Sequence, residues 1–293
     1  MSLDPAATAL RDQLRWKLVA AAATPLATDR SLDQPVLDRY LHSLVDDGAD
    51  ALAVLVHTGR GPFLDEPVRQ AVLGTAVGQG VAVIAGAGSP AEAEMAAKNG
   101  AAGLLVFAPV GRDPVAAHDA LWRAAELPMI VFDLYANPYP PGVLADLLAH
   151  PGVAGLKVAR LHDAIACQAA IAACLDADRL AITGEDRMFG PSLLWGAQAA
   201  LVGIAAAAVP ATSAVLGAFA QRRYADFVAA SARLDRLAAT VFADPVDGYV
   251  QRMLWIAAAE GRIADEFATD HFGPPLPPDE RERVLRVFTD ELQ

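Results

Sequence analysis

Cysteine and long apolar runs are both scarce in this 293-residue chain, although 54% of its residues are hydrophobic. The two cysteines, Cys167 and Cys174, lie seven positions apart in a predicted helix, which places them about two turns apart and too far for a disulfide. Reduced cysteines of this kind are typical of a cytoplasmic protein. Outside alanine-rich helical segments, no apolar run reaches the roughly 18 residues that a membrane span needs. Residues 1–15 lack a basic region followed by an apolar one, so we expect no signal peptide.

Positive charge is also in short supply. Lysine and arginine together number 23 against 35 aspartates and glutamates, which gives a net charge of -12 and a pI of about 4.8. Nucleic acids and anionic membranes bind clustered positive charge, so this balance argues against both as partners. The length is sufficient for one large domain, or for a barrel with an extension.

Lysine itself occurs only at positions 17, 98 and 157. Lys157 stands inside the short apolar run Val153–Ala159, which is typical of a buried strand. Lysine is rarely buried unless it is paired or used chemically. A desolvated ammonium loses its proton more readily, and the neutral amine attacks carbonyl groups to form a Schiff base. Lys157 is therefore the candidate nucleophile; the alternative is a lysine at a strand end whose ammonium group reaches solvent.

Short apolar runs alternate with helical patterns over the first two thirds of the chain. Runs that are apolar throughout indicate burial on both faces, and hence parallel pairing. Eight such runs predict an α/β fold, a (β/α)₈ TIM barrel with a C-terminal helical extension. An open, doubly wound sheet is the alternative, although the first strand lacks a GxGxxG turn. The expected strands cover residues 17–22, 52–56, 81–85, 103–107, 129–135, 153–159, 180–183 and 200–204.

Strand patterns end before residue 213. We therefore expect residues 1–212 to form the barrel with a short N-terminal helix, and residues 213–293 to form a helical region packed on the barrel. This last region includes a proline-rich irregular segment at residues 270–278. The helical patterns in it cover residues 215–221, 224–239, 246–261 and 279–292.

The C-terminal ends of the strands are where active sites form in such barrels. In this chain those positions carry a lysine, hydroxyl groups, a phenol and several glycines. They hold no cluster of His, Asp or Glu at metal-ligand spacing, so we expect no metal site. The glycine-rich turn at residues 85–88 lacks the lysine of a phosphate-binding loop. The side chains concerned are Thr24, His57, Thr58, Tyr135, Lys157, Glu185 and Asp186.

The order of these segments resembles the dihydrodipicolinate synthase / N-acetylneuraminate lyase family, from about residue 17 to about residue 220. The most specific segment is Gly155-Leu156-Lys157. The resemblance implies a divergent class I aldolase or lyase on a (β/α)₈ barrel, in which Lys157 condenses with pyruvate or another 2-oxo acid. The other matching segments are Thr24-Pro25-Leu26, Val56-His57-Thr58-Gly59-Arg60, Gly86-Ala87-Gly88, Leu127–Phe132 and Thr183-Gly184-Glu185-Asp186.

The loop at residues 56–60 is similar to the family's Gly-Thr-Thr-Gly-Glu loop, which holds the carboxylate of the 2-oxo acid. The resemblance implies that Thr58 and the backbone through Gly59 bind that carboxylate, and that Gly184 and Val202 let the substrate lie close to the barrel mouth. His57 stands where the family has a threonine. It is a candidate general acid/base, since an ordinary imidazole titrates near neutral pH; alternatively, it packs locally as a polar loop residue.

The fifth strand departs from the family pattern. The family has a proton-relaying tyrosine where this chain has Phe132, and Phe132 cannot transfer a proton. Tyr135, three residues on, is a candidate relay or a rim residue. Residues 136–139 lack the arginine, and residues 109–112 the intersubunit tyrosine, of dihydrodipicolinate synthases. The sequence therefore predicts an aldolase, lyase or dehydratase that acts on a different 2-oxo acid.

The expected mechanism begins when neutral Lys157 attacks the C2 carbonyl of pyruvate or of a deoxy-2-oxo sugar acid. The resulting iminium withdraws electrons and promotes cleavage or formation of a C–C bond, or dehydration. This chemistry needs no metal and no organic cofactor. The resemblance also implies a homo-oligomer, a tetramer or a dimer. Two alternatives stay open: a non-catalytic protein that binds small carboxylates on the same barrel, and an unrelated barrel enzyme that uses Glu185 and Asp186 with a metal.

Overall fold

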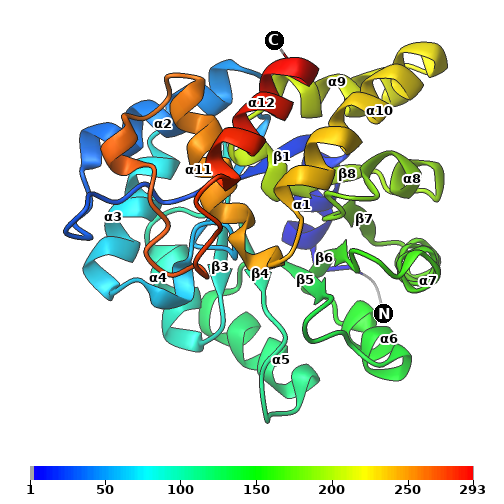
Figure 1. The fold of residues 1–293 in the computed structure, drawn as a ribbon. Helices are drawn as coiled ribbons and strands as arrows, with labels where there is room; N and C mark the ends of the chain where they lie inside the picture. The colour runs from blue at the N-terminus through cyan, green and yellow to red at the C-terminus, as the bar shows by residue number, and fades with distance from the viewer. Residues whose placement is uncertain (1–2, 293) are drawn as a thin grey trace.

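The computed structural model describes residues 3–292, and within them eight parallel strands close into a barrel in chain order (Figure 1). Helices follow the strands and surround the barrel, so the predicted (β/α)₈ TIM barrel is confirmed. Residues 1, 2 and 293, the outer ends of the two expected regions, lie outside the described residues. The strands are β1 (Leu18–Ala21), β2 (Ala51–Val54), β3 (Ala82–Ala87), β4 (Gly103–Val106), β5 (Met129–Leu134), β6 (Val153–Ala159), β7 (Leu180–Thr183) and β8 (Ala199–Val202).

The helices of the barrel begin at sequence signals that physical chemistry favours. Asp33 accepts a hydrogen bond from the backbone N–H of Val36 at 3.0 Å, and Asp163 does the same for Ala166 at 2.9 Å. Such caps satisfy N–H groups that have no partner in the first turn. The helices are α1 (Pro5–Leu14), α2 (Gln34–Asp46), α3 (Glu66–Val77), α4 (Pro90–Lys98), α5 (Pro114–Ala125), α6 (Pro141–Ala149), α7 (Ala164–Asp176), α8 (Phe189–Leu194), α9 (Val209–Ala220), α10 (Tyr224–Val241), α11 (Tyr249–Ala259) and α12 (Glu280–Leu292).

Each strand divides its side chains between two apolar layers, because successive residues of a strand point to opposite faces. In β1, Val19 and Ala21 belong to the cluster inside the barrel, whereas Leu18 and Ala20 belong to the layer between strands and helices. Helix α1 contributes to the inner cluster and covers the barrel at the N-terminal ends of the strands. The same alternation turns Lys157 of β6 toward the barrel axis, because Leu156 and Val158 on either side of it pack in the outer layer.

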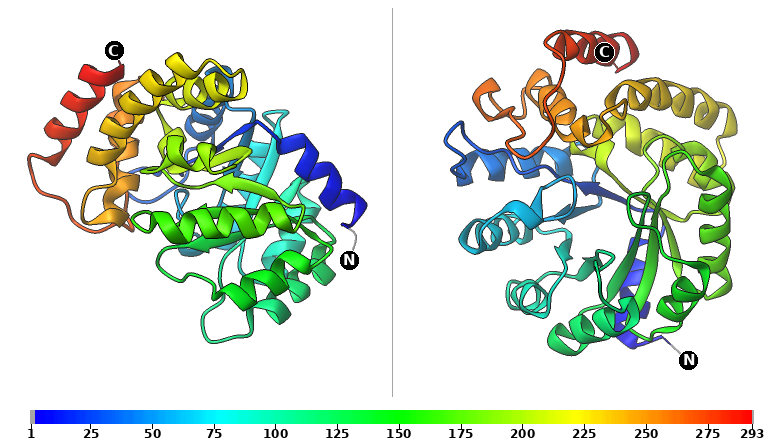
Figure 2. Two further views of the ribbon diagram at one scale, coloured as in Figure 1. Left: turned by 90° about the vertical axis from the view of Figure 1, so that its right-hand side faces the viewer. Right: turned by 60° about the horizontal axis from the view of Figure 1, so that its bottom comes forward.

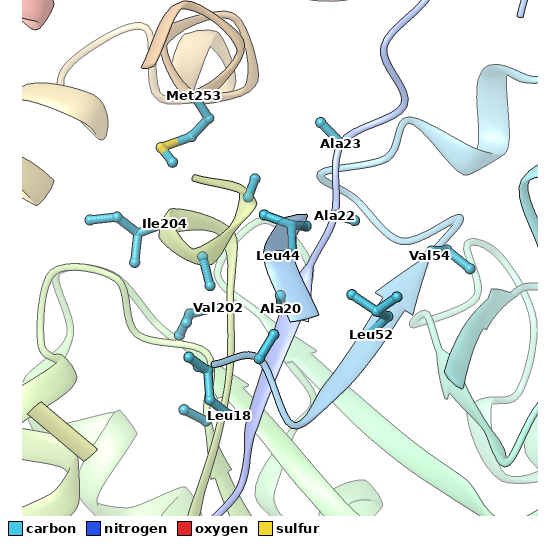
Figure 3. Close-up of a cluster of buried hydrophobic side chains, with 14 of the residues drawn as sticks. Leu18, Ala20, Ala22, Ala23, Leu44, Leu52, Val54, Val202, Ile204 and Met253 are labelled. Atoms are coloured by element: carbon cyan, nitrogen blue, oxygen red, sulfur yellow. The ribbon is translucent and has the colours of Figure 1, made fainter. Parts of the chain in front are cut away.

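Figure 3 shows part of the outer layer around β1, β2 and β8. Val202 at the end of β8 lies there with Leu18, and Met253 of α11 approaches from the C-terminal region. Both cysteines of α7 are buried and free, in keeping with their predicted packing role. Helix α11 of the C-terminal region thus shares one continuous apolar layer with the strands of the barrel.

The C-terminal helices lie together on one side of the barrel, and α12 and α1 stand at opposite sides of the molecule (Figure 2). Helix α9 starts at Val209, earlier than the sequence pattern predicts, because Pro210 occupies its first turn. The strand expected at 200–204 ends at Val202, where Gly203 begins a short 3₁₀ turn. A boundary at residue 212 stays a prediction. Among residues 3–292, no helix combines the length and apolar character that crossing a membrane requires.

Candidate active site

A pocket opens at the C-terminal ends of the strands and contains Lys157. Its walls come from β-strand ends and from the C-terminal region, which contributes Phe242, Val246 and Tyr249. A larger groove lies elsewhere, lined by α2, α9, α10 and α12, and within it Arg262 is paired with Glu260 and Asp47. The chemistry-bearing residues therefore converge on the pocket around Lys157.

Lys157 is buried, with 6% of its surface exposed, and its ammonium nitrogen Nζ lies 4.1 Å from the ring centre of Phe132. The two residues are direct neighbours across β5 and β6. Burial lowers the pKa of Lys157 to about 8, although the carboxylates of Asp186 and Glu185 act in the opposite direction. A substantial fraction of the amine is therefore neutral near physiological pH, which is the form that attacks a carbonyl.

Gly184 makes room for the lysine stem at the end of β7. A Cβ atom at position 184 would lie 2.6 Å from Cε and 2.9 Å from Cγ of Lys157, closer than real contacts allow. Gly184 also lines the pocket, as expected from the sequence. The absence of a side chain there sets the path that Lys157 follows into the pocket.

Glu185 and Asp186 leave β7 in different directions. The carboxylate of Glu185 accepts hydrogen bonds from the backbone N–H groups of Arg160 and Leu161, so it holds the loop after β6. Asp186 lines the pocket and accepts a hydrogen bond from the N–H of Ile204 at 2.7 Å. Burial raises the pKa of Asp186 to about 7. Within residues 3–292, no three His, Cys, Asp or Glu side chains gather closely enough to hold a metal ion.

Thr58 lies in the pocket and meets a partner that the sequence did not predict. Its hydroxyl group shares a 2.9 Å hydrogen bond with the phenol of Tyr249, the first residue of α11. Gly203 makes room for that ring, because a Cβ there would lie 2.8 Å from Cε2 of Tyr249. Burial raises the pKa of the Tyr249 phenol above its ordinary value, so the phenol stays protonated.

His57 and Tyr135 meet at the rim of the pocket through Asp247, whose side chain is 57% exposed. Oδ1 of Asp247 lies 3.5 Å from Nε2 of His57 and accepts a hydrogen bond of 3.3 Å from the Tyr135 hydroxyl. Burial lowers the pKa of His57 to about 4, and raises that of Tyr135 to about 12. His57 is thus a neutral imidazole at neutral pH. Its pKa lies below the ordinary histidine value on which its candidacy as a general acid/base was based.

Two predicted binding residues lie outside the pocket. The backbone of Gly59 packs against the end of β1, where Thr24 donates a hydrogen bond of 2.8 Å to its carbonyl. Val202 belongs to the outer apolar layer, and the following residue, Gly203, lines the pocket in its place. The reason is strand alternation, which places consecutive residues of β8 on opposite faces.

Arg60 joins the loop after β2 to the C-terminal region. Its guanidinium donates to Oδ2 of Asp270 at 2.7 Å and to the backbone carbonyl of Asp247 at 2.8 Å. The two charged side chains are 7% and 2% exposed, so this is a buried ion pair. It fixes Asp247, and through the chain Tyr249, over the barrel mouth.

The site residues that sequence reasoning missed are Tyr249 and Asp247. Both follow the predicted barrel, so examining strand ends could not find them. Asp186 was considered only as a possible metal ligand. The sequence offered only a weak signal for these two residues. Asp247 and Tyr249 flank a glycine just before a helical pattern, which indicates that a helix starts there but does not indicate which residues it contacts.

Comparison with known proteins identifies a family whose sequences match this chain. The profile of the Dihydrodipicolinate synthetase family matches residues 15–261. The 4-hydroxy-tetrahydrodipicolinate synthase of Mycolicibacterium paratuberculosis is 34% identical over 160 residues, which cover 49% of this chain and 53% of the relative. The corresponding synthase of Prochlorococcus marinus is 35% identical over 161 residues, which again cover 49% of this chain and 53% of the relative. The chain spans about half the length of the curated relatives that it matches.

Solved structures resemble the chain over almost its whole length. A prophage protein of the dihydrodipicolinic acid synthase family from E. coli K12, in complex with pyruvate, superposes with a TM-score of 0.85 at 17% identity, over 94% of this chain and 97% of the other. The N-acetylneuraminate lyase of Fusobacterium nucleatum gives a TM-score of 0.82 at 16% identity, over 96% of this chain and 100% of the other. At these identities the likeness shows the shared fold alone.

Proposed function

This chain belongs to the dihydrodipicolinate synthetase family, and we propose that it is a Schiff-base-forming lyase that acts on a 2-oxo acid. Pyruvate and deoxy-2-oxo sugar acids are the substrate classes that we expect. The observation that carries the proposal is Lys157, a buried lysine with a lowered pKa in a pocket at the C-terminal ends of the strands. Burial of a lysine is costly, and a catalytic role for its neutral form accounts for it.

The first step is attack by the neutral Nζ of Lys157 on the C2 carbonyl carbon. The N–C bond forms as the carbonyl π electrons move to oxygen, and loss of water then leaves an iminium. Its positive nitrogen accepts the electrons of the C3–C4 bond as that bond breaks, or it accepts the electrons left when C3 loses a proton, which gives an enamine that then expels the C4 hydroxyl. The backbone N–H groups at His57 and Thr58 are the proposed donors for the substrate carboxylate.

The substrate is proposed to differ from that of a true dihydrodipicolinate synthase. Phe132 stands in the pocket where the family pattern has a tyrosine, and its ring faces Lys157. Arg60 is engaged by Asp270, so its guanidinium is not free to bind a substrate carboxylate. A homo-oligomeric state and a cytoplasmic location are further parts of the proposal, with no nucleic acid or membrane as a partner.

Borohydride trapping tests the proposal directly. The folded protein is mixed with pyruvate or with each of a panel of 2-oxo acids, reduced, and analysed by intact mass and peptide mapping. We expect a stable adduct on the peptide that contains Lys157, and none in Lys157→Met. Lys17→Met is the matched control, because Lys17 forms a surface ion pair with Asp50 and lies outside the pocket.

The outcome separates the proposal from the binding-protein alternative. An adduct followed by turnover of one acid identifies the enzyme and its substrate class. If no acid forms an adduct and a 2-oxo acid nevertheless binds in calorimetry, the chain is a carboxylate-binding protein on the same barrel. Activity that persists in Lys157→Met and disappears with a chelator would instead indicate a metal enzyme.

A further inference from the structure

The pocket contains a pair of hydroxyl groups built from two distant parts of the chain. Thr58 follows β2, whereas Tyr249 opens α11, and their oxygen atoms lie 2.9 Å apart. Both residues line the pocket that holds Lys157, and both are buried, with 2% and 5% of their surfaces exposed. A buried hydroxyl pair in the same pocket as a buried amine is a polar arrangement that packing alone does not require.

The position of the Tyr249 ring is fixed on several sides. Phe242 stacks on it, with ring centres 4.8 Å apart and an interplanar angle of 20°. The ring of His57 lies 5.8 Å away, measured between ring centres. Gly203 leaves the space that the ring edge occupies. These contacts hold the phenol oxygen at Thr58 and leave little freedom for it to turn elsewhere.

The other aromatic side chains of the pocket do not offer an equivalent group. Phe132 faces Lys157 but has no hydroxyl. Tyr135 has one, but it donates to the exposed carboxylate of Asp247 at the rim. Among the described residues that line the pocket, the buried hydroxyl groups are therefore those of Thr58 and Tyr249.

Schiff-base formation needs a proton to move within the first adduct. When Nζ attacks the carbonyl carbon, the nitrogen becomes positive and the oxygen becomes an alkoxide. A proton must leave the nitrogen and a proton must reach the oxygen before water can depart. Hydroxyl groups that both donate and accept can perform this transfer without a net change in their own charge.

We propose that Tyr249 and Thr58 together transfer this proton, an inference that rests on the proposed function. Tyr249 donates its phenolic proton to the alkoxide oxygen, Thr58 donates its hydroxyl proton to the phenolate oxygen, and a proton from the adduct nitrogen returns to Thr58. Both hydroxyls are restored and the product is the neutral carbinolamine. Because burial disfavours a free phenolate at Tyr249, the return of a proton through Thr58 accompanies the donation.

The test is the rate of iminium formation in Tyr249→Phe, which keeps the stacked ring and removes the hydroxyl. Wild type and variant are mixed with pyruvate, quenched with borohydride at intervals, and analysed by mass. We expect the maximal rate to fall by about 100-fold or more, the range for loss of a general acid/base, with little change in the pyruvate concentration that gives half that rate. A purely structural role would change that concentration and the melting temperature instead.

Thr58 variants extend the test. Thr58→Val should lose a similar factor, Thr58→Ser should keep the rate within a few-fold, and the double variant Tyr249→Phe/Thr58→Val should be little slower than either single one, because the two hydroxyls act as a unit. Tyr139→Phe is the control: its phenol is buried without a hydrogen-bond partner and lies outside the pocket, so the rate should stay unchanged.

The possible failures are distinguishable. If wild type forms no adduct with any 2-oxo acid, both the proposed function and this inference are overturned. If wild type forms the adduct and Tyr249→Phe forms it equally fast, the inference alone is wrong. A large loss in Tyr135→Phe without one in Tyr249→Phe would assign the transfer to the rim phenol.

Discussion

Gly184 directly follows β7 and lies so close to Lys157 of the neighbouring β6 that a Cβ atom on the glycine would lie 2.6 Å from Cε of the lysine. The lysine side chain is also enclosed by Phe132 on the neighbouring strand. The direction in which its amine points is therefore set by the absence of an atom on one side and by an aromatic ring on the other.

We predict that Gly184→Ala displaces the Lys157 side chain and reduces borohydride trapping at least tenfold. The Cβ would also lie 2.9 Å from the backbone carbonyl oxygen of Val158, which cannot move as a side chain can, so the melting temperature should fall as well. Gly142→Ala is the matched control. Nothing lies within 4 Å of its Cβ position in α6, and alanine favours a helix, so trapping should be unchanged and stability unchanged or slightly higher. If borohydride traps Gly184→Ala as efficiently as it traps the wild type, the prediction is wrong.

The pH dependence of adduct formation should follow the Lys157 amine. Its pKa is lowered from 10.5 to about 8, so the trapping rate should rise with pH to a midpoint near 8, since the ammonium form below the midpoint has no lone pair. Asp186→Asn should move the midpoint lower, because the Asp186 carboxylate favours the ammonium form and asparagine can still accept the Ile204 N–H bond. A midpoint above 10 in wild type, or a shift upward in the variant, would count against this assignment.

Disruption of the Arg60–Asp270 ion pair should destabilise the protein strongly. Asp270→Ala leaves the buried guanidinium without its carboxylate, and loss of one partner of a buried pair costs roughly 3–5 kcal/mol of unfolding free energy. Denaturant unfolding measures it. Glu282→Ala is the surface control, since Glu282 and Arg286 are both largely exposed and their pair is expected to contribute less than about 1 kcal/mol. Equal effects of the two variants would show that the Arg60 pair is not energetically special.

His57 should remain a neutral imidazole through the neutral pH range. Its pKa is lowered from 6.5 to about 4 by burial, so its NMR resonances should titrate near pH 4, with His57→Gln supplying the assignment. Because the unfolded state takes up this proton first as pH falls, the titration should lower stability between about pH 6.5 and 4. A midpoint near 6.5 would restore His57 as a candidate general acid.

Much of the fold followed from local patterns. Each strand is apolar on both faces, and aspartate or serine caps precede many of the helices, so both element types and their alternation could be predicted from neighbouring residues. Lys157 could be singled out for the same reason: a charged residue in an apolar strand conflicts with its surroundings, and such conflicts mark functional sites. The profile of the family, which matches residues 15–261, agrees with the predicted resemblance.

The missed parts of the site are those assembled over long sequence separations. Thr58 and Tyr249 are 191 positions apart, and no periodicity in either segment indicates that they meet. Val202 was expected in the pocket, yet the structure places Gly203 there, because the end of β8 had to be known to a single residue before its faces could be assigned.

The amino-acid sequence by itself determined the barrel, the order of its elements and the lysine at its centre, because these depend on hydrophobic pattern and on local capping. Only the tertiary structure decided which groups surround that lysine. Its lowered pKa depends on burial and on the distances to Asp186 and Glu185, and the phenol of Tyr249 reaches the pocket because α11 packs over the barrel mouth. Electrostatic and hydrogen-bond energies depend on such distances in space, which sequence separation does not specify.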